Sequence, residues 1–253
     1  MRSARRPVRT TMVLALAAAV LWSLVGTSRA ADAPEPIKVC LVSGSLEYKS
    51  NETLAEFQKQ LEANYPVMCS RAFIVGENIH DLPGLENLDD CDVMLLFTRR
   101  LKLSGEQLER IKAYCMSGRP IVGVRTASHA VQTWLDLDRE VLGGNYKGHY
   151  GNDLITEVEL VGPRADHPIL RGVTPFRSAG SLYKNQGLSD NVDVLMTGTI
   201  PGHTEPITWT RDYNGGRVFY TALGHPQDFS ETSFRRLLTN AIFWAAGRDV
   251  PKR

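Results

Sequence analysis

Short apolar runs alternate with segments of helical spacing along the first half of the chain. The run IKVCLV (37–42) ends in Ser-Gly-Ser, and Leu54, Phe57 and Leu61 then fall on one face of a helix. The run DVMLLF (92–97) is continuously apolar, which is typical of a strand covered on both faces. The strands predicted in this half are residues 37–42, 67–75, 92–97 and 120–124.

The helix predicted between the third and fourth of these strands has clear end signals. Ser104 is the expected N-cap with Gln107 three residues on, and Gly118 is expected to end the helix. Strands and helices that alternate with short connections favour right-handed crossovers, which place helices on both faces of a parallel sheet. The sequence therefore predicts an α/β fold with a mostly parallel central sheet.

The second half of the chain is less regular. Residues 143–153 (GGNYKGHYGND) have no periodicity and predict a loop, and a loop of this length inside a compact domain is usually functional. The Asn-Gly-Gly stretch at 214–216 predicts a hairpin turn, and residues 231–246 have the spacing of a last amphipathic helix. The other strands predicted here are residues 155–161, 192–197, 207–211 and 217–223.

The first 30 residues have the composition of an export signal. Arginines near the start precede an uncharged apolar run (12–25), and Ser28 and Ala30 are the small residues expected before a cleavage site. The run is shorter than the ~20 residues of a membrane span, so an uncleaved anchor is the weaker alternative. We therefore expect an exported protein, periplasmic or extracellular and not bound to a membrane after cleavage. The expected parts are a signal peptide (1–30), a flexible lead (31–36) and one domain (37–253).

Charge and cysteine content argue against two classes of protein. The whole chain has 29 Lys+Arg against 28 Asp+Glu, and the signal holds five arginines and no acid, so 24 bases would remain against 28 acids. A mildly acidic protein without a basic run lacks the features of a nucleic-acid binder. The four cysteines include no C-x-x-C pair, which argues against a zinc site. Cys69 with Cys91 is the one disulfide that the pattern suggests for an exported protein.

Polar side chains follow several predicted strands, where ligands of open parallel sheets collect. The stretch GVRTASHA (123–130) has the strand, glycine turn and helix start at which α/β hydrolases place a nucleophile, but Arg125 stands at its tip. Free backbone N–H groups near Thr126 and Ser128 would favour an anion there. Alternatively, Arg125 pairs with a carboxylate and only holds loops together. Further binding candidates at this edge are Ser45, Glu47 and Arg99.

Three histidines are candidates for proton transfer. His225 follows an apolar strand in LGHPQDF, with Asp228 close enough in sequence to orient it. His129 follows the arginine turn and is either a second proton-transfer group or a core-edge histidine, and His149 lies in the irregular loop. Tyr183 is a candidate for stacking on a sugar, although loop tyrosines also pin loops to the core.

The order of several stretches resembles one known family. GVRTASHA, GGNYKGHYGND, DHPILRGVTPF, PITWTRDYNGGRVFYTALGHPQDF and FRRLLTNAIFWAAG together resemble the trehalose-utilisation, or ThuA-like, family of the class I glutamine amidotransferase-like superfamily. The resemblance covers nearly all of the chain after the signal and implies a flavodoxin-like three-layer sandwich. Amidotransferases carry a G-x-C-x-G turn and an H-P-E segment, which place the cysteine on Arg125, the histidine on His225 and the glutamate on Gln227. Thiol chemistry of the amidotransferase kind is therefore not expected.

The resemblance implies a role with trehalose-type disaccharides or their keto derivatives. The leading hypothesis is a lyase, isomerase or hydrolase in which His225 and a second histidine transfer protons while Arg125 holds negative charge. The first alternative is a non-catalytic sugar- or partner-binding module, and the second is a metal-dependent hydrolase using His149, His225 and Asp228. No cofactor is expected, since no G-x-G-x-x-G or phosphate-cradling loop follows the first strand. A homo-oligomer is left open.

Overall fold

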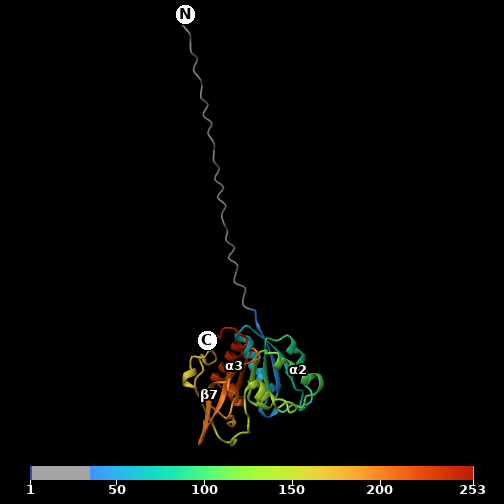
Figure 1. The fold of residues 1–253 in the computed structure, drawn as a ribbon, viewed down its shortest axis with the longest axis vertical. Helices are drawn as coiled ribbons and strands as arrows, with labels where there is room; N and C mark the ends of the chain where they lie inside the picture. The colour runs from blue at the N-terminus through green and yellow to red at the C-terminus, as the bar shows by residue number, and fades with distance from the viewer. Residues whose placement is uncertain (2–34, 253) are drawn as a thin grey trace. The chain divides into compact units, whose positions relative to one another are not determined.

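A nine-stranded sheet organises the protein, with the strand order β2-β1-β3-β4-β9-β8-β7-β5-β6 (Figure 1). The computed structural model describes Met1 and residues 35–252. Every strand expected from the apolar pattern is present, and β6 is the one that the pattern did not predict. The strands are β1 (Ile37–Gly44), β2 (Val67–Phe73), β3 (Val93–Thr98), β4 (Ile121–Val124), β5 (Thr156–Leu160), β6 (Phe176–Ser178), β7 (Asp193–Ile200), β8 (His203–Tyr213) and β9 (Gly216–Thr221).

The sheet is mixed, so the expectation of a mostly parallel sheet is wrong. The pairs β1–β2, β1–β3, β3–β4 and β4–β9 are parallel, whereas β9–β8, β8–β7, β7–β5 and β5–β6 are antiparallel. A hairpin at Asn214 and a tight turn at Gly202 reverse the chain on either side of β8. Burial along β5 alternates, as in strands with one exposed face, and this period of two is typical of antiparallel sheets.

Three α-helices cover the parallel half of the sheet: α1 (Ser50–Asn64), α2 (Gly105–Met116) and α3 (Thr232–Ala245). The ring of Phe229, in the short helix η7 (Pro226–Ser230), contacts Phe57 of α1 and Phe234 of α3, so these two helices share a face. In Figure 1, α2 and α3 lie on opposite sides of the parallel strands. All six residues of β3 are buried between these layers, in agreement with the apolar run that predicted the strand.

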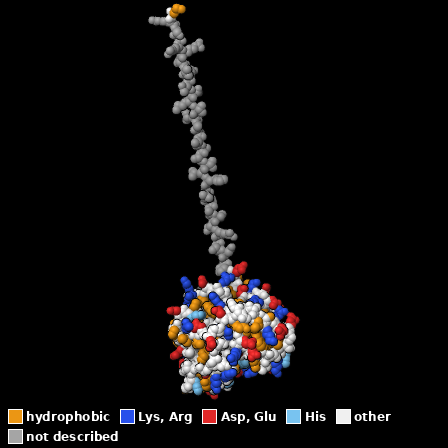
Figure 2. Space-filling model, viewed as in Figure 1, with side chains coloured by type: hydrophobic (Ala, Val, Ile, Leu, Met, Phe, Trp, Pro, Cys, Tyr) orange, Lys and Arg blue, Asp and Glu red, His pale blue; other side chains and the backbone are white. Residues whose placement is uncertain are grey.

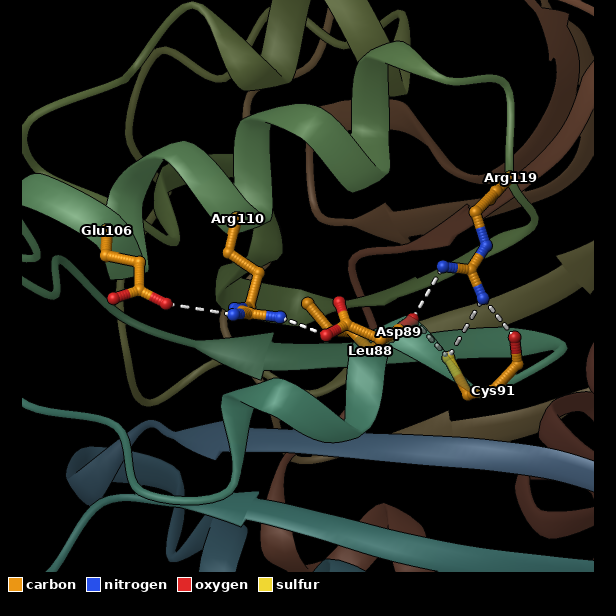
Figure 3. A network of polar contacts seen from close by, with 6 residues as sticks. All are labelled: Leu88, Asp89, Cys91, Glu106, Arg110 and Arg119. Atoms are coloured by element: carbon orange, nitrogen blue, oxygen red, sulfur yellow. Dashed lines mark hydrogen bonds and ion pairs between the residues drawn. The ribbon is translucent and has the colours of Figure 1, made fainter.

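The end of the sheet at which β3 and β4 begin is fixed by two arginines (Figure 3). Arg110 of α2 bonds both Asp89 and Glu106. Arg119, directly before β4, donates to the backbone oxygens of Leu88 and Cys91. These contacts hold the short helix η2 (Leu85–Asp89) against α2, at the end of the sheet opposite to the predicted site. All four cysteines are free, so Cys69 and Cys91 are not joined in this structure.

The structure does not test the predictions made for the N-terminal segment. The predicted signal peptide and most of the expected lead lie outside the part of the chain that the structure describes. Between residues 35 and 252, no helix has the length and apolar character needed to cross a membrane. On the face of the domain shown in Figure 2, basic and acidic side chains are interspersed.

Candidate functional site

The carboxyl ends of β1, β3, β4 and β9 form one edge of the sheet, called the rim below. Lys49, Arg100 and Arg125 follow β1, β3 and β4 and have φ angles of 48°, 47° and 45°, in the left-handed region that L side chains rarely adopt. The fourth such non-glycine residue in the described chain is Asn214, in the hairpin turn. Strained backbone of this kind persists only where the surroundings hold it, and it clusters at functional sites. The backbone thus points to the same edge as the sequence.

Arg125 stands at the tip of the turn after β4, but its side chain points into the protein and is only 1% exposed. Its guanidinium donates to the carbonyl oxygen of Ala222 at 2.6 Å, to the carbonyl and hydroxyl oxygens of Ser181 at 3.3 and 3.2 Å, and to the hydroxyl of Tyr48 at 3.2 Å. Among the described residues, no carboxylate forms an ion pair with it. Arg125 therefore joins separate segments, as one interpretation of the sequence had it, but through neutral oxygens.

A stack of five side chains runs from Arg125 to the loop at 143–153. The guanidinium carbon lies 4.4 Å from the ring centroid of Tyr48 and 4.7 Å from that of Tyr183. Tyr183 contacts Tyr146 with ring centroids 4.6 Å apart, and Tyr146 stacks on His129 at 4.6 Å and an interplanar angle of 17°. The ring of Tyr183 is buried within this stack, so it pins the loop to the core instead of lying open to a ligand.

The turn that follows Arg125 is a short 3-10 helix, η3 (Arg125–His129), and all five of its residues are buried. The hydroxyl of Thr126 donates to the hydroxyl of Ser45 at 3.1 Å, and the N–H of Ser45 donates to the hydroxyl of Ser50 at 2.8 Å. Thr126 and Ser45 are both fully buried. These two predicted binding residues therefore link the ends of β1 and β4 inside the protein.

His225 and Asp228 lie at the other end of the rim, where His225 packs edge-on against Tyr48 with ring centroids 6.4 Å apart. The carboxylate of Asp228 accepts from the backbone N–H groups of Gly224 and His225 at 2.8 and 2.9 Å, so it bonds the turn and not the imidazole ring. Nδ1 of His225 accepts from the N–H of Gln227 at 3.3 Å, which places its proton on Nε2. Burial lowers the pKa of His225 and raises that of Asp228. Both residues therefore cap η7, which is a different partnership from the one expected.

An open cleft of about 820 Å³ lies beside the His129 end of the stack. Four of the predicted site residues line it, namely Arg99, Ser128, His129 and His149. The other seven are absent from its lining: Ser45, Glu47, Arg125, Thr126, Tyr183, His225 and Asp228. The remaining lining residues are Arg100, Leu135, Asp136, Asp138, Arg139, Asn145, Tyr146, Lys147 and Gly148.

His129 is held in its neutral form at the back of this cleft. It is 5% exposed, and its Nδ1 lies 3.0 Å from the hydroxyl of Ser128. Burial, followed by the positive charges of Arg100, Arg99 and Arg125, lowers the pKa of His129 to about 3. At neutral pH the ring is therefore an uncharged hydrogen-bonding group.

His149 approaches the cleft from the irregular loop and is exposed. Its Nδ1 lies 2.6 Å from the carbonyl oxygen of Tyr150, so the neutral ring carries its proton on Nδ1 and leaves a free lone pair on Nε2. A bridge between His149 and Tyr183 holds this part of the loop. Glu205, which is 3% exposed, accepts from the hydroxyl of Tyr150 at 2.9 Å and fixes the loop further. A free lone pair on a positioned ring is what a general base requires.

Asp138 is a cleft residue that the sequence analysis missed. Its Oδ2 accepts from the N–H of Tyr146 at 2.8 Å, while its buried Oδ1 has no hydrogen-bond partner. Burial raises the pKa of Asp138 to about 6. A Cβ on Gly144 would lie 2.1 Å from Oδ1, so the Gly143-Gly144 pair was the available sequence signal of a close approach. Asp138 therefore positions Tyr146, and it is a protonatable group in the cleft that His129 and His149 also line.

Arg99 is placed at the outer part of the rim by an ion pair of 2.8 Å with Glu47, and both side chains are substantially exposed. The sequence predicted both as binding residues, and the structure brings them together. In the described chain, no three His, Cys, Asp or Glu side chains are grouped closely enough to hold a metal ion. The set His149, His225 and Asp228 that the metal-dependent alternative needs is therefore not assembled.

Comparison with known proteins agrees with this fold. The chain is similar to a ThuA-like protein from Parabacteroides merdae ATCC 43184 (22% identity, TM-score 0.68, 87% of this chain and 93% of that one) and to one from Bacteroides uniformis ATCC 8492 (16%, 0.65, 86% and 94%). A β-galactosidase from Rahnella sp. R3 has a TM-score of 0.54 and 16% identity over 86% of this chain but only 32% of its own. No curated protein matches.

The fold and rim define an α/β protein with a large mixed sheet and a polar cleft at the carboxyl ends of its parallel strands. A family model described as ThuA, trehalose utilisation, matches residues 38–245. The chain belongs to this ThuA family.

The bonds of Arg125 are expected to contribute strongly to stability. Arg125→Lys keeps the charge but cannot reach the oxygens of Ala222 and Ser181 together, and buried acceptors without donors cost about 1–3 kcal/mol each. We expect chemical denaturation to show a loss of about 2–4 kcal/mol in the free energy of unfolding. The exposed Arg177→Lys is the matched control, with a change within about 0.5 kcal/mol. An Arg125→Lys protein as stable as the wild type would contradict this structural role.

The neutral state of His129 is expected to make stability depend on pH. Between the unfolded pKa of about 6.5 and the folded pKa of about 3, the unfolded chain binds a proton that the folded protein does not. This part of the stability is fully present above pH 6.5 and is lost as the pH falls towards 3, by at most about 1.4 kcal/mol per pH unit. The raised pKa of Asp138 acts in the opposite sense, so the wild type must be compared with a variant that keeps Asp138.

His129→Gln removes the titrating ring, so its unfolding free energy should fall less than that of the wild type between pH 7 and pH 4 in urea titrations. The exposed His80→Gln is the control and should follow the wild type. Equal losses in the wild type and in His129→Gln would show that His129 is not held neutral.

Proposed function

We propose that this protein binds a trehalose-type disaccharide or its keto derivative in the cleft beside His129 and His149, and acts on it by proton transfer. The observation that carries the proposal is the pair of histidines in different hydrogen-bonding states within one cleft. His149 offers a free lone pair, and His129 is an uncharged ring that forms hydrogen bonds without adding positive charge. Such a division of roles suits removal of a proton beside a carbonyl group.

The other cleft residues suit a polyhydroxylated ligand. Tyr146 is half-buried and presents an aromatic ring that lies against His129, and aromatic rings commonly stack on sugars. Asn145 supplies an amide at the same lining, and the volume of about 820 Å³ lies within the usual range of small-molecule sites. Family membership supports a carbohydrate ligand, since the family is described as trehalose utilisation. We further propose that the protein works after export, because of the signal-like composition of its first 30 residues.

In this proposal, His149 Nε2 takes the proton and the neutral His129 hydrogen-bonds the sugar oxygen at which charge develops. Arg125 and His225 act through structure: Arg125 fixes the rim, and the Nδ1 of His225 is committed to capping η7. The leading hypothesis from the sequence assigned proton transfer to His225 and the binding of negative charge to Arg125. Because both side chains are used in structural contacts, we assign the chemistry to His149 and His129 in the cleft.

A binding module without turnover is the second candidate. It is favoured by one observation, the use of the His225 and Asp228 side chains in backbone hydrogen bonds of the η7 turn. Arg125 stands where the resemblance places the amidotransferase cysteine, and His225 is used in a cap. Such a protein could keep the cleft for binding alone.

The test is incubation of the purified protein with trehalose, other disaccharides and their 3-keto derivatives, followed by product analysis and calorimetric titration. We expect conversion of a keto sugar, with kcat reduced about 10²- to 10⁴-fold in His149→Gln and KM changed far less. His80→Gln, outside the cleft, is the matched control and should retain kcat. Binding without conversion supports the module, and absence of binding by every sugar contradicts both candidates.

A further inference from the structure

The cleft contains more basic than acidic side chains. Arg99 and Arg100 enter it from the end of β3, Arg139 from the one-turn π-helix η4 (Asp138–Leu142), and Lys147 from the loop. Only two carboxyl groups, Asp136 and Asp138, belong to the lining. Four cations from three different elements therefore line one cleft, whereas the face of the domain shown in Figure 2 mixes both signs.

Most of this positive charge has no counterion within the described chain. Arg99 is paired with Glu47, but Arg100 donates from Nη1 to the neutral amide oxygen of Gln132 at 2.8 Å. No ion pair forms at Arg139 or Lys147 among the described residues. Of the two acids, Asp138 is buried with a pKa raised to about 6, so it is neutral below that pH, and above it its one charge acts mainly on Lys147.

Arg100 is placed rather than free. Its backbone has a left-handed φ of 47°, and its N–H donates to the carbonyl oxygen of His129 at 2.8 Å. The next residue, Leu101, forms a bridge with Val131, so the turn after β3 is fastened to the turn after β4. Strain of this kind is kept where the surroundings determine the position of the residue. The arginines also act electrically on the cleft, since Arg100 and Arg99 are the largest causes, after burial, of the low pKa of His129.

We propose that the saccharide bound in this cleft carries an anionic group, a carboxylate or a phosphate, which is held by Arg100 and Lys147 while the sugar hydroxyls face His129 and Tyr146. This inference rests on the proposed function, because it names the class of sugar that the same cleft takes. A guanidinium matches the two oxygens of a carboxylate or phosphate, and a lysine adds a point charge. Arg139 belongs to the same lining, and its charge adds to the attraction.

The test is calorimetric titration of the purified protein with three ligands on one skeleton: trehalose, trehalose with one hydroxymethyl group oxidised to a carboxylate, and trehalose 6-phosphate. We expect at least one anionic form to bind about tenfold more tightly than trehalose at low ionic strength, and this advantage to shrink as salt is added. The comparison of carboxylate with phosphate then identifies which anion the site takes.

Substitutions of Arg100 and Lys147 test where the anionic group binds. Arg100→Gln and Lys147→Gln should each weaken binding of the preferred anionic form about five- to tenfold, and by more than they weaken binding of trehalose. Arg177→Gln removes an exposed arginine outside the cleft and should change neither affinity. Thermal unfolding of each variant checks that it is folded, and having two independent variants keeps the test open if one is not.

Three results would overturn the proposal. If trehalose binds as tightly as both anionic forms, the saccharide needs no anionic group, and the proposed function is unaffected. The same holds if the tighter binding of the anionic form is unchanged in both variants. Absence of binding by all three ligands would also overturn the proposal, and the proposed function falls with it if the 3-keto derivatives fail to bind as well.

Discussion

The rim depends on one buried cation. Moving a guanidinium out of water costs several kcal/mol unless its N–H groups are bonded. Both terminal nitrogens of Arg125 donate to neutral oxygens and two tyrosine rings flank the group, while Nε has no partner among the described residues. Its partners Tyr48, Ser181 and Ala222 are 56 to 97 residues away along the chain. Because one side chain bonds all three, the ends of β4 and β9, the turn after β1 and the segment before Tyr183 have fixed relative positions.

The turn after β4 carries no nucleophile and has a structural role through Arg125. The backbone at Arg125 is left-handed, as at turns that present a reactive side chain, but this side chain turns inward and joins a stack that ends at Tyr146 and His129. The carboxylate of Asp138 also holds Tyr146, by accepting from the backbone N–H of Tyr146. The proposed chemistry therefore lies at the far end of the stack, in the cleft, and Arg125 supports it by holding the loop in place.

The sequence predicted the strands well, because runs such as IKVCLV and DVMLLF report burial directly. Strand direction was predicted poorly on the β5 side, where the alternation in TEVEL was the available sign of an antiparallel strand. His129 and His149, which line the cleft, were predicted from residue type and from their positions after a strand and in a loop. The inward direction of Arg125 could not be predicted, since it depends on Tyr48 and Ser181, which are distant in sequence. Asp138 was missed because its raised pKa comes from burial, which residue type does not reveal.

A crystal structure of the protein with a bound disaccharide is the most direct test of this site. The sugar should lie in the cleft, in contact with His129, Tyr146 and His149, while Arg125 keeps its bonds to Ala222 and Ser181. A sugar bonded to the Arg125 guanidinium itself, or one bound beside His225 and away from the cleft, would contradict this assignment of the site.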